Sequence, residues 1–133
     1  MLLNILVMST NNESIFISGN VPSSKNGKIW TGKRFIWSKA CQKYTKNTRE
    51  EWLKYRKKFI ELSKGKEFPL VVEFQFIRGS KHKFDYPNPL QTVLDLMVKY
   101  SWISDDNADV IFPVFKTYSY DKGNPGVYIK ILN

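Results

Sequence analysis

The first half of the chain changes from an alternating pattern of polar and apolar residues to a helical one. Alternation over residues 14–18 predicts a β-strand, and the turn-forming residues from Gly19 to Gly32 predict a loop after it. From Ser38 onward, apolar residues recur at intervals of three and four and share one face of a predicted helix. They are Cys41, Tyr44, Thr48, Trp52, Tyr55, Phe59 and Leu62. Because Thr48 and Glu51 fit a capping box, the spacing also predicts a break in this helix near Asn47.

The remainder of the sequence predicts three strands around a second helix. Gly65 is expected to end the first helix, and Leu70 to Ile77 is a strand rich in Val, Ile and Phe. A second helix to about Tyr100 buries Leu90, Val93, Leu94, Met97 and Val98. Closing strands are predicted over Val110 to Phe115 and Gly126 to Leu132. This order predicts one α+β domain over residues 1–133, a small mixed β-sheet packed with two helices.

Composition limits the classes of protein to which the chain can belong. With 133 residues, 42% of them hydrophobic, it is long enough for one domain with its own core. One Cys and one His exclude an internal disulfide framework and a Cys/His zinc site. The apolar residues 1–8 are too few to span a bilayer and lack a signal peptide's basic start; they are a frayed strand or an extension before a start at Met8. We therefore expect a soluble, cytoplasmic protein with no membrane partner.

Positive charge is concentrated in one segment of the chain. The net charge is +9, and residues 25–66 hold 14 Lys and Arg against three acidic residues, whereas residues 67–133 hold seven against eight. A concentrated positive surface attracts polyanions through Coulomb steering and counterion release. A solvated, lysine-rich helix face explains the same count, so charge alone leaves both interpretations open.

The candidate chemistry lies in carboxylates and amides around the second predicted helix. Motifs for a serine nucleophile or a phosphate-binding glycine loop are missing from the sequence. The candidate residues are Asp85, Asn88, Gln91 and Asp95, with Asp105 and Asp106 about ten residues later in a turn-like stretch. Two or three carboxylates at one point suit Mg²⁺, which takes oxygen ligands and keeps several waters. Such an ion can lower the pKa of a water that attacks a phosphodiester.

Each of these residues also has a purely structural explanation. Asn88 followed by Pro89 is typical of an N-cap with Pro at the first helical position. Asp85 near a helix N-terminus is favoured by the helix dipole. Asp105 and Asp106 could form an ordinary turn, and Asp95 could be a solvated helix residue. Residue types alone therefore leave a metal site and a set of caps and turns both open.

The sequence around these carboxylates resembles that of a known family. Residues 84–97 (FDYPNPLQTVLDLM) and 102–106 (WISDD) resemble the D-x-D-N-x-x-K-x-x-x-D-x-L and D-D signature of RusA-type Holliday-junction resolvases. Residues 19–26 (GNVPSSKN) resemble the opening strand and P-S-x-x-N loop of that family. The two blocks occur in the family's order and separation, and with the basic helix between them they span nearly the whole chain.

The resemblance implies a homodimeric, Mg²⁺- or Mn²⁺-dependent endonuclease that nicks four-way DNA junctions symmetrically during recombination and repair. Carried over by position, Asp85 and Asp106 hold the metal with Asp105 beside them, and Asn88 and Asp95 match the family's Asn and helix Asp. The chain departs from the signature at Pro87, where the family has Asp, and at Gln91, where it has Lys. Because these changes remove one ligand and one cation, we expect either a divergent working site or a junction-binding protein that has lost catalysis.

Basic and aromatic residues flank the predicted acidic centre. The predicted nucleic-acid contacts are Lys25, Asn26, Lys28, Lys33, Arg34, Lys81 and Lys83. The lysines and the arginine would neutralise phosphates, and Asn26 would hydrogen-bond to the DNA backbone or a sugar, so we expect recognition of junction shape. Trp30, Phe35 and Trp37 are predicted either to stack on exposed bases or, for at least two of them, to pack in the core or a dimer contact. An RNA-binding module would also fit the charge and the aromatic residues, but it leaves the acidic pattern unexplained.

Overall fold

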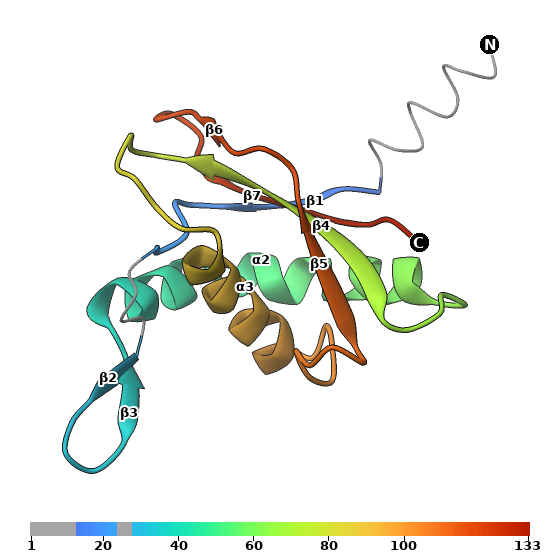
Figure 1. The fold of residues 1–133 in the computed structure, drawn as a ribbon, viewed down its shortest axis with the longest axis horizontal. Helices are drawn as coiled ribbons and strands as arrows, with labels where there is room; N and C mark the ends of the chain where they lie inside the picture. The colour runs from blue at the N-terminus through green and yellow to red at the C-terminus, as the bar shows by residue number, and fades with distance from the viewer. Residues whose placement is uncertain (1–12, 24–27) are drawn as a thin grey trace.

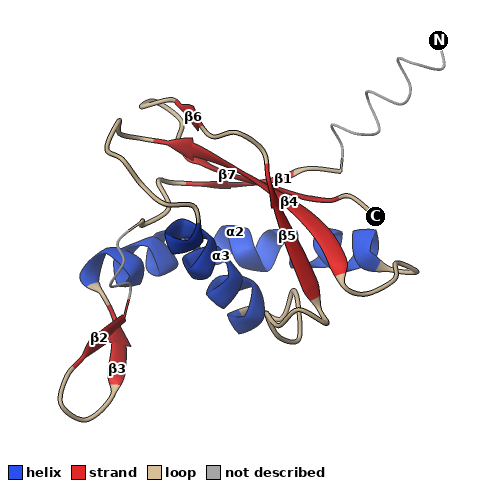
Figure 2. Cartoon of the chain, viewed as in Figure 1, coloured by secondary structure: helices blue, strands red, loops and turns tan. Residues whose placement is uncertain are grey.

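The computed structural model describes residues 13–23 and 28–133, and the predictions for residues 1–8, Lys25 and Asn26 lie outside these ranges. Figures 1 and 2 show the arrangement of the helices and strands. The elements are β1 (Ile15–Ser18), β2 (Lys28–Trp30), β3 (Phe35–Trp37), α2 (Lys39–Ser63), β4 (Leu70–Arg78), α3 (Pro87–Lys99), β5 (Ile111–Phe115), β6 (Ser119–Tyr120) and β7 (Gly126–Ile131).

The main sheet is mixed, and its strands lie in the order β1-β7-β4-β5, with β6 also paired to β4. Strand β7 runs antiparallel to both β1 and β4, whereas β5 and β6 run parallel to β4. A parallel pair needs a crossover connection, and α3 supplies it between β4 and β5. The predicted α+β class, with a small mixed sheet and two helices, is confirmed.

The core lies between one face of the sheet and the two helices (Figure 1). Burial alternates along β4, so that Val72, Phe74 and Phe76 are fully buried while the residues between them are only partly buried. Helix α2 contributes Trp52 and Phe59, both of which pack against the ring of Trp102. The core therefore forms where the predicted apolar stripes of both helices meet the sheet.

Helix α2 runs unbroken for 25 residues, so the predicted break near Asn47 is wrong. The two residues that fit a capping box have other partners. The Thr48 hydroxyl donates to the Tyr44 carbonyl and accepts from the Trp52 indole N–H. The Glu51 carboxylate accepts from the backbone N–H and the hydroxyl of Ser18 in β1. The helix is capped instead by Ser38, whose hydroxyl accepts from the Cys41 N–H at 3.3 Å.

Helix α3 begins at Pro87, so the prediction that Asn88 caps it is also wrong. Tyr86 is the N-cap residue and makes no capping hydrogen bond with its side chain. Pro87 starts the helix because its fixed φ suits the first helical position, where its missing N–H is not needed. Asn88 therefore lies inside the first turn, and its backbone N–H donates to the Asp85 carbonyl.

Two features of the sheet regions were not predicted. The segment predicted as a loop to Gly32 instead contains β2, which pairs with β3 in a hairpin that projects from the body of the protein (Figure 1). All three residues of β2 are exposed, so the strand carries no alternation of buried and exposed positions. The two-residue strand β6 is too short for such a pattern. Within the described ranges, no helix is both long and apolar enough to cross a bilayer.

Candidate functional site

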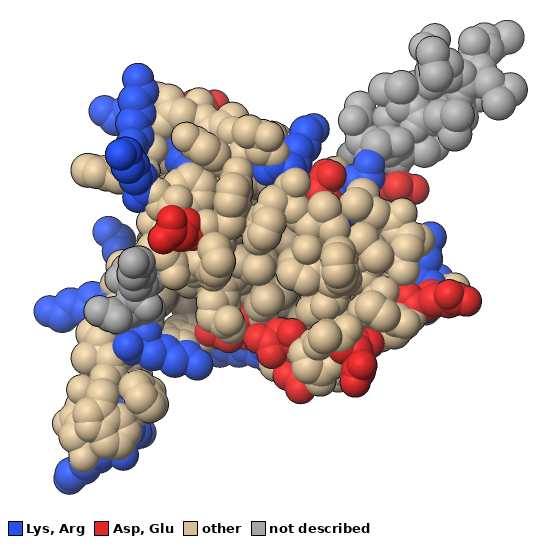
Figure 3. Space-filling view, in the orientation of Figure 1, with Lys and Arg blue, Asp and Glu red and all other residues tan. Residues whose placement is uncertain are grey.

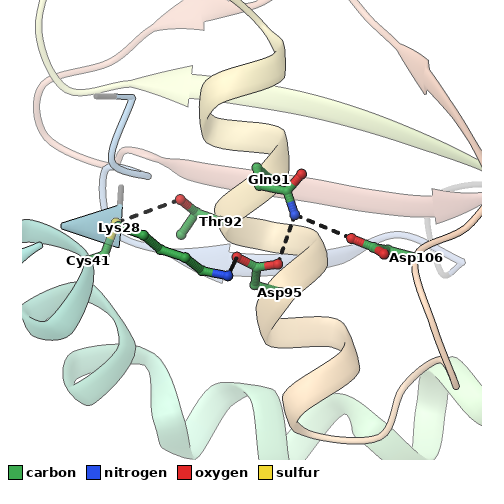
Figure 4. Close-up of polar contacts among 6 residues, drawn as sticks. All are labelled: Lys28, Cys41, Gln91, Thr92, Asp95 and Asp106. Atoms are coloured by element: carbon green, nitrogen blue, oxygen red, sulfur yellow. Dashed lines mark hydrogen bonds and ion pairs between the residues drawn. The ribbon is translucent and has the colours of Figure 1, made fainter. Parts of the chain in front are cut away.

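Three polar side chains meet on the outer surface of α3 and form what we call the acidic pocket: Gln91, Asp95 and Asp106 (Figure 4). The Gln91 amide nitrogen donates to Asp95 Oδ1 at 2.8 Å and to Asp106 Oδ2 at 3.3 Å. Both carboxylates are only partly exposed, whereas Gln91 is exposed. One neutral donor thus holds two carboxylates that come from different segments of the chain.

Local structure explains why these residues meet. Gln91 and Asp95 are four residues apart on a helix and so lie on the same face. The chain then reverses at Ser101, whose φ of 61° is left-handed, and Trp102 donates its backbone N–H to the Met97 carbonyl. The Trp102 indole is anchored in the core by a hydrogen bond to the Trp52 carbonyl. This reversal returns the chain alongside α3 and brings Asp106 to the pocket.

Asp105 supports the turn and does not join the pocket. Its carboxylate accepts from the Asp106 backbone N–H at 2.8 Å and from the Asn107 side-chain amide at 2.9 Å. These two hydrogen bonds, the backbone one first, lower the pKa of Asp105 below its ordinary value. The structure therefore separates the paired aspartates, one into the turn and one into the pocket.

Asp85 and Asn88 lie ahead of the pocket along the chain and make no hydrogen bond to its members. Asp85 is exposed, and its position is set by its two neighbours. The Phe84 ring packs edge-on against Tyr118, and the Tyr86 ring stacks on Phe115 with centroids 4.7 Å apart. The Tyr86 hydroxyl also accepts from the Tyr118 backbone N–H. These contacts fix the backbone on both sides of Asp85 and leave its carboxylate facing solvent.

A buried arginine, which the sequence analysis did not single out, holds the same loop. Arg78 ends β4 and is only 4% exposed; it donates to the Val21 carbonyl at 2.7 Å. Its guanidinium lies 4.7 Å from the centroid of the Phe84 ring. Burial lowers the pKa of Arg78, while nearby Tyr44 acts in the opposite direction. The signal was in the sequence, because the alternation along β4 assigns Arg78 to the same face as Phe74 and Phe76.

One cation contacts the acidic pocket, and four others lie exposed in the hairpin and in the loop before α3. Lys28 Nζ, in β2, lies 3.9 Å from Asp95 Oδ2, and Lys33 and Arg34 follow in the exposed turn of the hairpin. Lys81 and Lys83 are exposed in the loop between β4 and α3. In Figure 3, Lys and Arg side chains gather over the projecting hairpin, whereas acidic side chains gather near the turn that follows α3. The pocket therefore lies at a boundary between positive and negative surface.

Asp95 and Asp106 are the pocket residues that a divalent ion of the Mg²⁺ type would use as ligands. No group of three His, Cys, Asp or Glu residues is arranged to hold a metal in the part of the chain that the structure describes. Two carboxylate oxygens nevertheless point at one amide nitrogen, and the Gln91 amide also carries an oxygen. Mg²⁺ commonly binds through one or two carboxylates together with waters and substrate phosphates. The three-carboxylate set of Asp85, Asp105 and Asp106 is not gathered in this way.

Comparisons with known proteins do not identify a family. No protein-family model matches the chain, and no curated protein matches it. The resemblance to RusA-type resolvases therefore stays a prediction based on the motifs.

Proposed function

We propose that this protein is a metal-dependent endonuclease that binds and cleaves branched DNA, with four-way junctions as its main substrate. The observation that carries the proposal is the convergence of Asp95 and Asp106 on Gln91, next to Lys28. Carboxylates alone would repel DNA, whereas carboxylates that can hold a divalent ion among lysines can receive a phosphate. The motifs shared with RusA-type resolvases support the same substrate.

In this proposal, Asp95 and Asp106 hold the ion. The Gln91 amide, whose nitrogen donates to both carboxylates, turns so that its oxygen faces the ion. The exposed Asp85, in the loop before α3, supplies a further carboxylate. When bound, the ion would offset charge on the phosphodiester and lower the pKa of an attacking water. Lys28, Lys33 and Arg34 bind phosphates of the strand on one side, and Lys81 and Lys83 bind them on the other. These contacts give affinity for the backbone and for the shape of the branch, without sequence information.

We further propose that the protein acts as a homodimer, because a four-way junction has approximate two-fold symmetry and two nicks need two sites. The sheet face turned away from the helices supports this proposal. Phe112 pairs in register with Val71 and Tyr128 with Gln75, which places both aromatic rings on that face. Both rings are exposed, as is Leu132. Burying such a surface against a second copy would remove it from water.

A junction-binding protein without catalysis is the second candidate. It is favoured by the turn that occupies the Asp105 carboxylate and by Pro87 in place of a carboxylate. Such a protein would bind junctions with an affinity that falls steeply with salt, and it would not cleave them at any concentration of Mg²⁺ or Mn²⁺.

Cleavage of a synthetic four-way junction separates the two candidates. We expect cleavage with Mg²⁺ or Mn²⁺, and a loss of about a hundred-fold in rate for Asp106→Asn and for Asp85→Asn, which remove ionic oxygen ligands. Asp109→Asn is the matched control, because it makes the same change in charge in the same turn without touching Gln91. Equal rates for the wild type and both variants would exclude the proposed site. If the wild type does not cleave, Pro87→Asp with Gln91→Lys tests whether catalysis returns.

A further inference from the structure

The β2–β3 hairpin is an ordered arm whose conformation is fixed at its tip. Thr31 donates both its backbone N–H and its hydroxyl to the Arg34 carbonyl, at 3.0 and 3.1 Å. Gly32 has a φ of 92°, a left-handed conformation that favours glycine, and it lets the chain turn between these residues. At the base, the Gln42 amide of α2 donates to the Trp37 carbonyl at 2.6 Å. The arm therefore presents a defined surface.

One face of this arm carries a row of aromatic side chains. Lys28 pairs in register with Trp37, and Trp30 pairs with Phe35, so these four side chains share a face. The Trp30 and Phe35 rings lie 5.1 Å apart near the tip and are 56% and 67% exposed. Trp37 lies at the base, is packed against the core and has Lys99 Nζ 5.2 Å from its ring centroid. Of the three aromatic residues, only Trp37 is packed against the core, which leaves two rings open to solvent.

The charges around this face favour a nucleic acid as its partner. The sequence holds no Asp or Glu from residue 14 to residue 49, and Lys28, Lys33 and Arg34 flank the exposed rings. Nucleobases offer flat faces for stacking, and their phosphates offer anions for lysine and arginine. In intact duplex the base faces are covered by neighbouring pairs, so stacking requires bases opened at a branch or in a single strand. A shallow, open hollow also lies along β3, lined by Arg34, Phe35, Ile36, Trp37 and Gln42.

The base of the arm contacts the acidic pocket. Lys28, on the aromatic face, is the residue that contacts Asp95 of the pocket (Figure 4). A strand whose bases stack along this face would thus run from the tip of the arm toward the pocket.

We propose that Trp30 and Phe35 stack on unpaired bases at a branch point and so hold the adjoining strand next to the acidic pocket. This inference rests on the proposed function for its substrate class, but it concerns binding and needs no metal.

The test measures DNA binding by the full chain in EDTA, where cleavage plays no part. The probes are a four-way junction with two unpaired thymidines at its branch point and a linear duplex of the same length. We expect Trp30→Ala and Phe35→Ala each to weaken binding to the junction at least about five-fold, and to change duplex binding less than about two-fold. Trp30→Phe keeps a ring and is expected to retain most of the affinity. Phe68→Ala, which removes a ring of similar exposure from the turn before β4, is the matched control and should have no such effect.

Three results would overturn the inference: unchanged junction binding, an equal loss on junction and duplex, or a change of oligomeric state in sedimentation. The last would make the arm a contact between copies of the chain. Because both rings are exposed, the variants are expected to fold, and circular dichroism checks this. Failure of this inference is distinct from failure of the proposed function. If the Trp30 and Phe35 variants lose junction selectivity and the wild type shows no metal-dependent cleavage, the role of the arm is supported and the nuclease is rejected. If the wild type cleaves junctions and the variants bind them unchanged, the nuclease is supported and the role of the arm is rejected.

Discussion

The acidic pocket and the loop before α3 carry carboxylates that the motifs assign to one site, yet the fold holds them in different ways. In the pocket, Asp95 and Asp106 are joined directly through the Gln91 amide. In the loop, Asp85 makes no such contact, and its backbone is fixed by the packing of Phe84 and Tyr86. The pocket is thus held together by its own polar groups, and the loop by aromatic neighbours.

This difference shows which parts of the proposed site depend on one another. A change at Gln91 should act on both pocket carboxylates and leave the loop in place. A change at Arg78, under Phe84, should act on the loop and leave the pocket in place. The proposed nuclease requires both parts to reach the same phosphodiester. Substitutions at Gln91 and at Arg78 should therefore change the free energy of unfolding by different amounts, while both should lower the rate of junction cleavage.

The largest effect on stability is expected from Arg78→Met. The substitution leaves the buried Val21 carbonyl without its donor and removes the cation from the Phe84 ring. We expect the free energy of unfolding to fall by about 2 kcal/mol, since a hydrogen bond to a charged group and a cation–π contact are both lost. Denaturant unfolding measures this. An unchanged unfolding midpoint would show that Arg78 does not hold the loop.

Gln91→Glu is expected to lower the free energy of unfolding by a smaller amount, and Mn²⁺ is expected to restore it. The substitution replaces the shared donor with a third carboxylate, so like charges should lower the free energy of unfolding by about 0.5–1 kcal/mol without metal. The same three carboxylates should bind Mn²⁺ more tightly, and bound Mn²⁺ should restore the lost stability. Unfolding curves with and without Mn²⁺ measure both effects. A variant that Mn²⁺ stabilises no more than the wild type would contradict the assignment of the pocket.

The smallest effect is a pH dependence at Asp105. Because its hydrogen bonds lower its pKa in the folded state, the ionised form stabilises the turn. This contribution is fully present above the unfolded pKa of about 3.9 and is lost as pH falls through the lower, folded value. Asp105→Asn should therefore be less stable than the wild type at neutral pH, and the difference should shrink below about pH 4. Unfolding measured across this range checks it, and a difference that does not vary with pH would contradict it.

Much of the fold could be predicted because buried positions in helices and strands recur at regular intervals and are occupied by apolar residues. The stripe through Trp52 and Phe59 predicted α2, and the alternation over Leu70 to Ile77 predicted β4. The break near Asn47 was wrong because Thr48 and Glu51 have partners in their own helix and in β1, which local spacing does not reveal. The β2–β3 hairpin was missed because its residues are exposed and show no such recurrence.

The candidate site could be predicted only in part. Gln91 and Asp95 were among the candidate residues, and their spacing of four is the spacing that brings side chains together on a helix, as the structure shows. Asp106 was also a candidate, and the structure brings it to the same amide. The separate roles of Asp105 and Asp106 could not be predicted. The two residues are identical and adjacent in sequence, and only the conformation of the turn directs the Asp105 carboxylate to a backbone N–H. The contact of Lys28 with Asp95 depends on how the hairpin packs, which the sequence alone does not specify.

Direct measurement of Mn²⁺ binding by the metal-free protein tests the central claim, that Asp95 and Asp106 form a cation site. Electron paramagnetic resonance of free Mn²⁺, titrated into the wild type, Asp106→Asn and Asp109→Asn, gives affinity and stoichiometry. We predict one ion per chain for the wild type and Asp109→Asn, and a loss of about ten-fold or more in affinity for Asp106→Asn. Equal binding by all three proteins, or none by the wild type, would contradict the account.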